Sequence, residues 1–194
     1  MKGMKFIMKN IKKLNKIAIM LGMVLFLAVT LTGCSIGGKE VSRNTTINKK
    51  QLDGYTEYVD KSGIRFSYPS DWKDLSGSSD QPLFGDVSTG SSVNYLSEDV
   101  PSSLKIDSYM SSAISNVKEQ MDISGDVEEN PVILNGKKAT IIKYSVNQAG
   151  TTATIKQAVF IEDGKAHVLT VAVLEDEELD QTEVVDNIIN SFTK

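Results

Sequence analysis

The chain has 194 residues, of which 40% are hydrophobic, 21 are basic and 25 are acidic. This length suits one folded domain with a targeting segment. Six lysines and no acid lie in residues 1–33, so residues 34–194 hold 15 basic against 25 acidic side chains, a net charge of −10. That charge weighs against nucleic-acid binding and against electrostatic adhesion to anionic lipid.

Residues 1–33 have the pattern of an export signal. The lysines precede a 13-residue apolar run, residues 17–29, and small residues follow it. A basic region, a short apolar region and a small-residue cleavage site define a removable secretion signal. A permanent transmembrane helix needs about 20 apolar residues, and this run is shorter.

The segment Leu31-Thr32-Gly33-Cys34 resembles the lipobox of bacterial lipoproteins. The resemblance implies transfer of diacylglycerol to the Cys34 thiol and cleavage between Gly33 and Cys34. Two acyl chains anchor a protein stably to a membrane. A lone cysteine is otherwise most often a buried small hydrophobe, but this one directly follows the signal-like run. We therefore expect a protein anchored in the cell membrane on its extracytoplasmic face, with no disulfide because Cys34 is the only cysteine.

Residues 34–52 are polar and lack an apolar period, which predicts a flexible tether. The folded domain is expected over residues 53–194. Its first elements are a weakly alternating strand at 55–59, a turn at 60–63 and a half-buried strand at 64–68. Pro69 stops that strand, Trp72 follows, and two short strands are expected at 82–88 and 92–96.

Residues 106–121 have helical periodicity, and Asp107 is a candidate N-cap. The apolar stripe consists of Ile106, Tyr109, Met110, Ala113, Ile114, Val117 and Met121. Strands are then expected at 127–134, 138–146, 153–161 and 166–174. Asn135-Gly136 predicts a two-residue type I′ hairpin between the first two.

The last expected element is a helix over 180–192, with a capping box at Asp180-Gln181-Thr182-Glu183. This order predicts an α+β fold in which two α-helices pack on an antiparallel β-sheet.

Two segments resemble PsbP-like and DcrB-like domains. Residues 63–72 contain Phe66, Tyr68, Pro69 and Trp72 in the pattern F-x-Y-P-x-x-W, and residues 188–192 end in the pattern I-x-x-S-F. The resemblance covers about residues 55–194 and implies the PsbP-like fold. It also implies a non-enzymatic protein that binds or stabilises a larger envelope or lumenal complex.

Candidate chemistry in the sequence is sparse. His167 is the only histidine. One interpretation is a general base or a metal ligand, but we favour a histidine that simply lies on a face of the sheet. The acidic run 175–178 with Asp180 lacks the spacing of a calcium loop and is better explained as a solvated loop before a helix. No catalytic residue, metal site or cofactor is therefore expected, apart from the covalent diacylglycerol on Cys34.

Trp72 and Tyr109 are the candidate ligand-binding residues. They could line a groove, but Trp72 is more simply explained as a plug at the end of the sheet beneath the first helix. The leading hypothesis is a membrane-anchored, non-enzymatic binding or scaffold lipoprotein with a protein partner in the cell envelope. The alternative is a small-ligand receptor with a pocket between sheet and helices; a hydrolase ranks well behind both.

Overall fold

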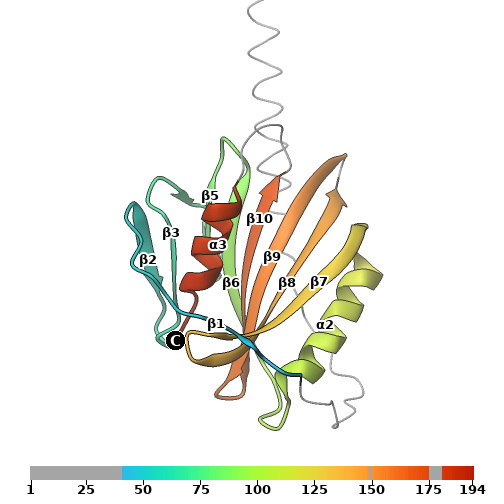
Figure 1. Ribbon diagram of the computed structural model, residues 1–194. Coiled ribbons are helices and arrows are strands. Elements are labelled where there is room, and N and C mark those ends of the chain that lie inside the picture. The colour runs from blue at the N-terminus through green and yellow to red at the C-terminus, as the bar shows by residue number, and fades with distance from the viewer. Residues whose placement is uncertain (1–40, 149, 175–180) are drawn as a thin grey trace, which may run out of the picture.

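The structure is a computed structural model, and it describes residues 41–148, 150–174 and 181–194. An eight-stranded sheet forms its centre, with one helix on each face and a small separate hairpin (Figure 1). The expected α+β fold with two helices packed on a mostly antiparallel sheet is confirmed. In the described part of the chain, no helix is long and apolar enough to cross a bilayer.

The strands of the large sheet lie in the order β1-β7-β8-β9-β10-β6-β5-β4, in which β1 is Thr45–Ile47. Its centre is the predicted meander of four consecutive antiparallel strands. These are β7 (Ile123–Leu134), β8 (Lys137–Gln148), β9 (Thr151–Glu162) and β10 (Lys165–Leu174). On the far side of β10 follow β6 (Ser91–Asp99), β5 (Leu83–Asp86) and the two-residue β4 (Lys73–Asp74).

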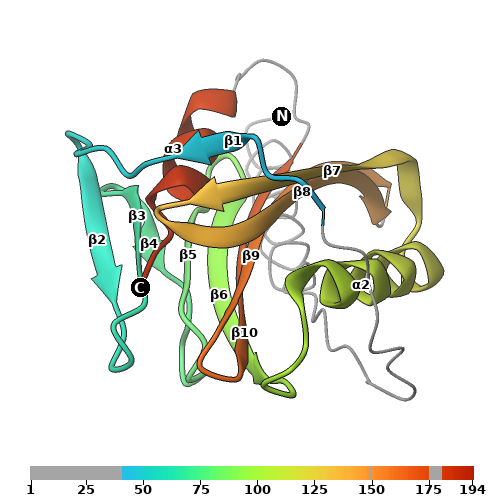
Figure 2. The same cartoon turned by 60° about the horizontal axis from the view of Figure 1, so that its bottom comes forward.

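The first predicted hairpin forms a separate two-stranded sheet. Its strands are β2 (Tyr55–Val59) and β3 (Arg65–Pro69), paired antiparallel. Asp60 shapes the turn between them, because its carboxylate accepts hydrogen bonds from the backbone N–H groups of Ser62 and Ile64. Figure 2 shows this hairpin beside the helix α3 (Thr182–Ser191).

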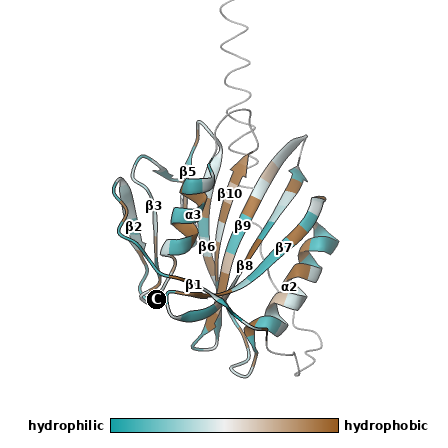
Figure 3. Cartoon of the chain, viewed as in Figure 1, coloured by the Kyte–Doolittle hydropathy of each residue, from teal (hydrophilic) through white to brown (hydrophobic). Residues whose placement is uncertain are grey.

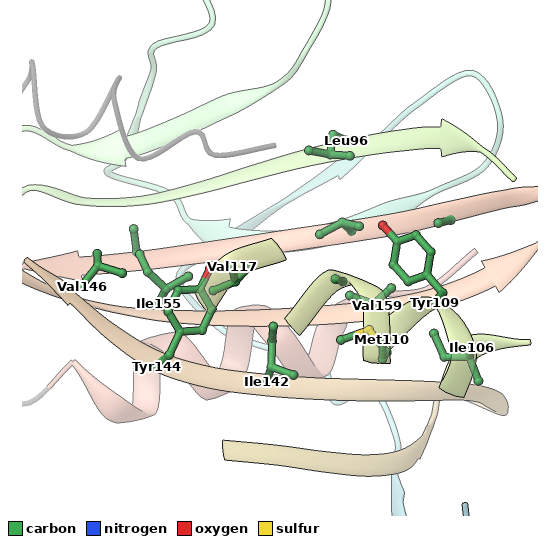
Figure 4. Close-up of a cluster of buried hydrophobic side chains, with 14 of the residues drawn as sticks. Leu96, Ile106, Tyr109, Met110, Val117, Ile142, Tyr144, Val146, Ile155 and Val159 are labelled. Carbon is green, nitrogen blue, oxygen red and sulfur yellow. The ribbon is translucent and has the colours of Figure 1, made fainter. Parts of the chain in front are cut away.

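The helix α2 (Ile106–Gln120) covers one face of the large sheet, which we call the α2 face, and α3 covers the other, which we call the α3 face. The apolar stripe of α2 packs on side chains of β8, β9, β10 and β6 that alternate toward it (Figure 4). Tyr109, Met110 and Ala113 are fully buried at this contact. Each large apolar side chain that is buried stabilises the folded state by about 1.5–3 kcal/mol. The stripe therefore fixes the position of the helix on the sheet.

The opposite face carries α3 and the hairpin. Phe66 of β3, Phe160 of β9 and Ile188 of α3 belong to its core, and all are buried. Figure 3 shows hydrophobic residues concentrated in the central strands, whereas the first part of β7 is hydrophilic. The helices therefore lie on opposite faces of the sheet, and the molecule has two apolar cores.

Three local predictions need correction. The N-cap residue of α2 is Lys105, whose side chain makes no capping bond, and Asp107 lies in the first turn instead. The N-cap of α3 is Gln181, so the proposed capping box is out of register; Asp180 lies outside the described residues. Trp72 is not beneath the first helix, because it belongs to the core under α3.

The segment expected as a tether is partly structured. Thr45–Ile47 forms β1, which pairs in parallel with Val132–Leu134 at the edge of β7. Ile47 also packs against the core on the α3 face. We call residues 41–49 the strap, because they lie across one edge of the sheet before β2 begins (Figure 2).

Candidate functional site

The two motifs that carry the family resemblance meet in the folded chain. The backbone N–H of Ser67 donates to the Ser191 hydroxyl at 2.7 Å, and that hydroxyl donates to the Ile188 carbonyl at 2.6 Å. Next to them, Arg65 and Thr193 exchange backbone hydrogen bonds of 2.9 and 3.0 Å. The motif residues thus join β3 to the end of α3, so they specify the fold and not a binding site.

The strap is fixed to the start of α2 by an ion pair. The Arg43 guanidinium contacts both carboxylate oxygens of Asp107, and the side chains are 4% and 9% exposed. Arg43 also donates to the carbonyls of Val41 and Ala139, and the Val41 N–H donates to Asp107 at 3.1 Å. A forked guanidinium suits such multiple contacts, which a lysine could not all make.

Burial alone would raise the pKa of the Asp107 carboxyl. Hydrogen bonds from Arg43 and from the Val41 N–H outweigh that effect and hold the pKa below its ordinary value. Asp107 is therefore charged at neutral pH. A negative charge in the first turn of a helix is also favoured by the helix dipole.

A cavity of about 450 Å³ opens beside this ion pair. The loop before α2 supplies Ser102 and Lys105, and β8 supplies Lys138. The end of β9 supplies Glu162, and the β9–β10 turn supplies Asp163. Its size is in the range of small-molecule sites. Sequence reasoning missed this site, because its charged residues come from segments that no local pattern connects.

His167 lies in a buried aromatic cluster on the α3 face. The residue is 2% exposed, and its ring stacks on Tyr95 and contacts Phe160. The Tyr95 hydroxyl and the His167 Nδ1 atom form a hydrogen bond of 2.9 Å. Burial lowers the pKa of His167 and raises that of Tyr95 to about 12, so both are neutral at pH 7. This placement matches the favoured interpretation of a histidine on a sheet face.

The two candidate ligand-binding aromatics do not share a site. Trp72 is 9% exposed in the α3-face core, whereas Tyr109 is fully buried on the α2 face. The Tyr109 hydroxyl donates to the Glu98 carboxylate at 2.6 Å. Burial and this neighbouring carboxylate raise the pKa of Tyr109. Neither side chain lines the cavity at the start of α2.

Several predicted features lie outside the described residues. They are the export signal 1–33, the lipidated Cys34, the first part of the tether and the acidic run 175–178. Within the described residues, no group of three or more histidine, cysteine or acidic side chains is arranged to hold a metal ion.

A family model for PsbP-like proteins matches residues 16–193. The chain therefore belongs to the PsbP-like family, as the two motifs predicted. No curated protein sequence matches the chain significantly.

Several solved structures are similar in fold to this chain. Cyanobacterial PsbP (CyanoP) from Synechocystis has a TM-score of 0.51 and 16% identity, and the match covers 84% of this chain and 98% of that one. A Pseudomonas aeruginosa protein of unknown function, PA94, has a TM-score of 0.51 and 12% identity over 72% of this chain and 96% of its own. The Ran-binding protein Mog1p from Saccharomyces cerevisiae has a TM-score of 0.50 and 12% identity over 76% and 96%. At these identities the likeness shows a shared fold.

Proposed function

We propose that this chain is an exported lipoprotein, anchored through diacylglycerol on Cys34, whose PsbP-like domain binds or supports a protein complex of the cell envelope. The observation that carries this proposal is the segment 31–34, which has the lipobox pattern directly after a basic and apolar signal. Two acyl chains on the thiol hold such a protein at the membrane without a transmembrane helix.

The burial of the candidate catalytic group supports a binding role over catalysis. His167 is the only histidine of the chain, and its ring is enclosed by Tyr95 and Phe160. A general base needs to reach a substrate proton within hydrogen-bond distance. His167 is instead hydrogen bonded to Tyr95 inside the core, where it supports packing.

Crosslinking in intact membranes tests the binding role. We expect a crosslinker applied to cells that produce the full chain to capture a reproducible envelope protein. Recovery should be lower for a Cys34→Ala variant, because it is not held at the membrane surface. Repeated recovery of no specific protein from the anchored chain would count against a scaffold.

A small-ligand receptor remains the second candidate, and the cavity beside α2 favours it. Two basic residues, Lys105 and Lys138, and two apolar residues, Leu104 and Ile161, are among those that line it. A ligand in this cavity should raise the unfolding temperature of the domain by mass action. Substitution Lys138→Ala should abolish that rise, and a ligand whose effect survives the substitution would bind elsewhere.

A further inference from the structure

The docked strap shortens the connection between the lipid and the folded domain. Val41 lies seven positions after Cys34 and is the first described residue of the strap that is held on the domain. Such a segment spans at most about 25 Å when fully extended. If the strap were free up to the start of β2 at Tyr55, the reach would grow to about 70 Å.

The strap is held by several independent contacts. Arg43 and Val41 fix its first part to Asp107 at the start of α2, and β1 adds backbone pairing with β7. At its end, the Asn135 N–H donates to the Ile47 carbonyl at 2.7 Å, and Asn135 also accepts a hydrogen bond from the Lys49 N–H. Because the ion pair is largely buried, salt screens it less than an exposed pair.

Val41 is docked at one end of the domain, which we call the α2 end. This end consists of the loop 101–105, the start of α2 and the β9–β10 turn (Figure 1). Residues from all three segments line the cavity beside Arg43. The β5–β6 turn, which contains Ser88, lies at the opposite end. The nine residues of β6 separate the two ends, a distance of about 30 Å.

We propose that the docked strap holds the α2 end of the domain toward the lipid bilayer, and leaves the end that contains the β5–β6 turn facing away from it. This inference rests on the lipid at Cys34 in the proposed function. The partner of the α2 end is the membrane surface itself. With residues 34–194 at a net charge of −10, attraction to anionic lipid does not supply this orientation. The short covalent connection does.

Energy transfer to a labelled bilayer tests the orientation. The sulfur of Cys34 carries the lipid, so a single introduced cysteine, Ser102→Cys or Ser88→Cys, is the only free thiol for a donor dye; both serines are exposed. The processed, lipid-bearing protein is placed in phosphatidylcholine vesicles whose outer leaflet contains an acceptor lipid. We expect at least twofold greater transfer from position 102 than from position 88.

Two variants remove the constraint in different ways. The pair Arg43→Gln and Asp107→Asn releases the first part of the strap without leaving a buried charge unpaired. A 20-residue Gly/Ser insertion between Gly38 and Lys39 lengthens the connection and leaves every contact of the domain intact. Both should bring the ratio of transfer at positions 102 and 88 toward one, whereas Asp126→Asn on the exposed edge of β7 should keep it.

The outcomes separate this inference from the proposed function. Equal transfer from positions 102 and 88 on vesicle-bound wild-type protein overturns the orientation alone. An unchanged ratio after the Gly/Ser insertion overturns the role of the strap. A protein that carries no lipid and does not bind vesicles overturns the proposed function, and the orientation with it.

Discussion

The side-chain amide of Asn135 donates a 2.8 Å hydrogen bond to the main-chain carbonyl of Phe192, 57 residues further along the chain. The same amide donates to the Asn190 carbonyl at 3.0 Å. Asn135 also occupies the left-handed region, with φ of 50°, in the predicted turn with Gly136. The backbone of Asn135 therefore forms the β7–β8 turn, and its side chain fixes the end of α3 and the strap to this turn.

Substitution Asn135→Asp should destabilise the domain by about 2–3 kcal/mol. Aspartate tolerates the same backbone conformation, but it replaces the donor with a carboxylate facing two carbonyls that lose their partners. Urea unfolding measures the change. Asp163→Asn is the matched control, because Asp163 has φ of 52° at the equivalent position of the β9–β10 turn and should show little change. Equal effects of both substitutions would contradict this role of Asn135.

Release of the domain by an arginine-specific protease should report on the strap. Arg43 and Arg65 are the only arginines, so cleavage after Arg43 separates the domain from its lipid. Because the Arg43 side chain is only 4% exposed, cleavage requires undocking. Removing one member of a buried ion pair costs about 3–5 kcal/mol. We therefore expect Asp107→Asn to speed release from membranes at least tenfold.

The control for this protease assay is Asp126→Asn, the same chemical change at an exposed position on β7. Its release rate should match that of the wild type. Fragment masses distinguish cleavage at Arg43 from cleavage at Arg65. Identical rates for Asp107→Asn and the wild type would show that the ion pair does not hold the strap.

Replacing Gly90 should lower the free energy of unfolding, because a side chain at this position would meet Leu174. Gly90 has φ of +77°, and a Cβ atom there would collide with the Leu174 side chain. Gly90→Ala should lower the free energy of unfolding by about 2–4 kcal/mol, from backbone strain and overpacking together. Gly77 has φ of +61° and no atom within 4 Å of such a Cβ. Gly77→Ala should therefore cost only about 1 kcal/mol, and equal losses would refute the contact with Leu174.

Stability should fall below neutral pH because of His167. Burial lowers the pKa of its imidazole from the ordinary value of 6.5, while the Glu162 backbone and the Asp60 carboxylate partly oppose this. The unfolded chain therefore takes up the proton at a higher pH than the folded chain. The contribution of neutral His167 to the free energy of unfolding is complete above about pH 6.5. It is lost as the pH falls toward the pKa of the folded state, and the free energy of unfolding then falls by up to about 1.4 kcal/mol per pH unit.

The matched variant is His167→Phe, which keeps a ring beside Phe160 but cannot titrate. Urea unfolding between pH 7.5 and 5.5 should show a slope for the wild type and a flatter profile for the variant. This window lies above the titration of ordinary carboxylates. Parallel slopes would mean that His167 does not cause the pH dependence.

Periodicity predicted the regular elements well. The apolar stripe from Ile106 to Val117 and the alternation within β9 depend on local pattern, and both recur in the structure. The first four residues of β7, before the predicted start at Val127, were missed because they are mostly exposed and polar, with a register shift between Ser124 and Glu128. A strand of this kind has no apolar alternation to reveal it.

Contacts between segments that are far apart in the sequence could not be predicted from local sequence patterns. Thr45–Ile47 is too short and polar to be predicted as a strand, and it pairs only because β7 presents a free edge. Arg43 and Asp107 are 64 residues apart, so no local spacing connects them. The side of the sheet on which Trp72 lies also depends on the path of the chain between β3 and β5.

Intact-mass measurement of the membrane-purified protein is the sharpest test of lipid attachment at Cys34. We expect a chain that begins at Cys34 and carries the mass of diacylglycerol. A Cys34→Ser variant should carry no lipid and should leave the membrane fraction. A wild-type chain with no added lipid mass, together with a serine variant that still sediments with membranes, would show that Cys34 is not the membrane anchor.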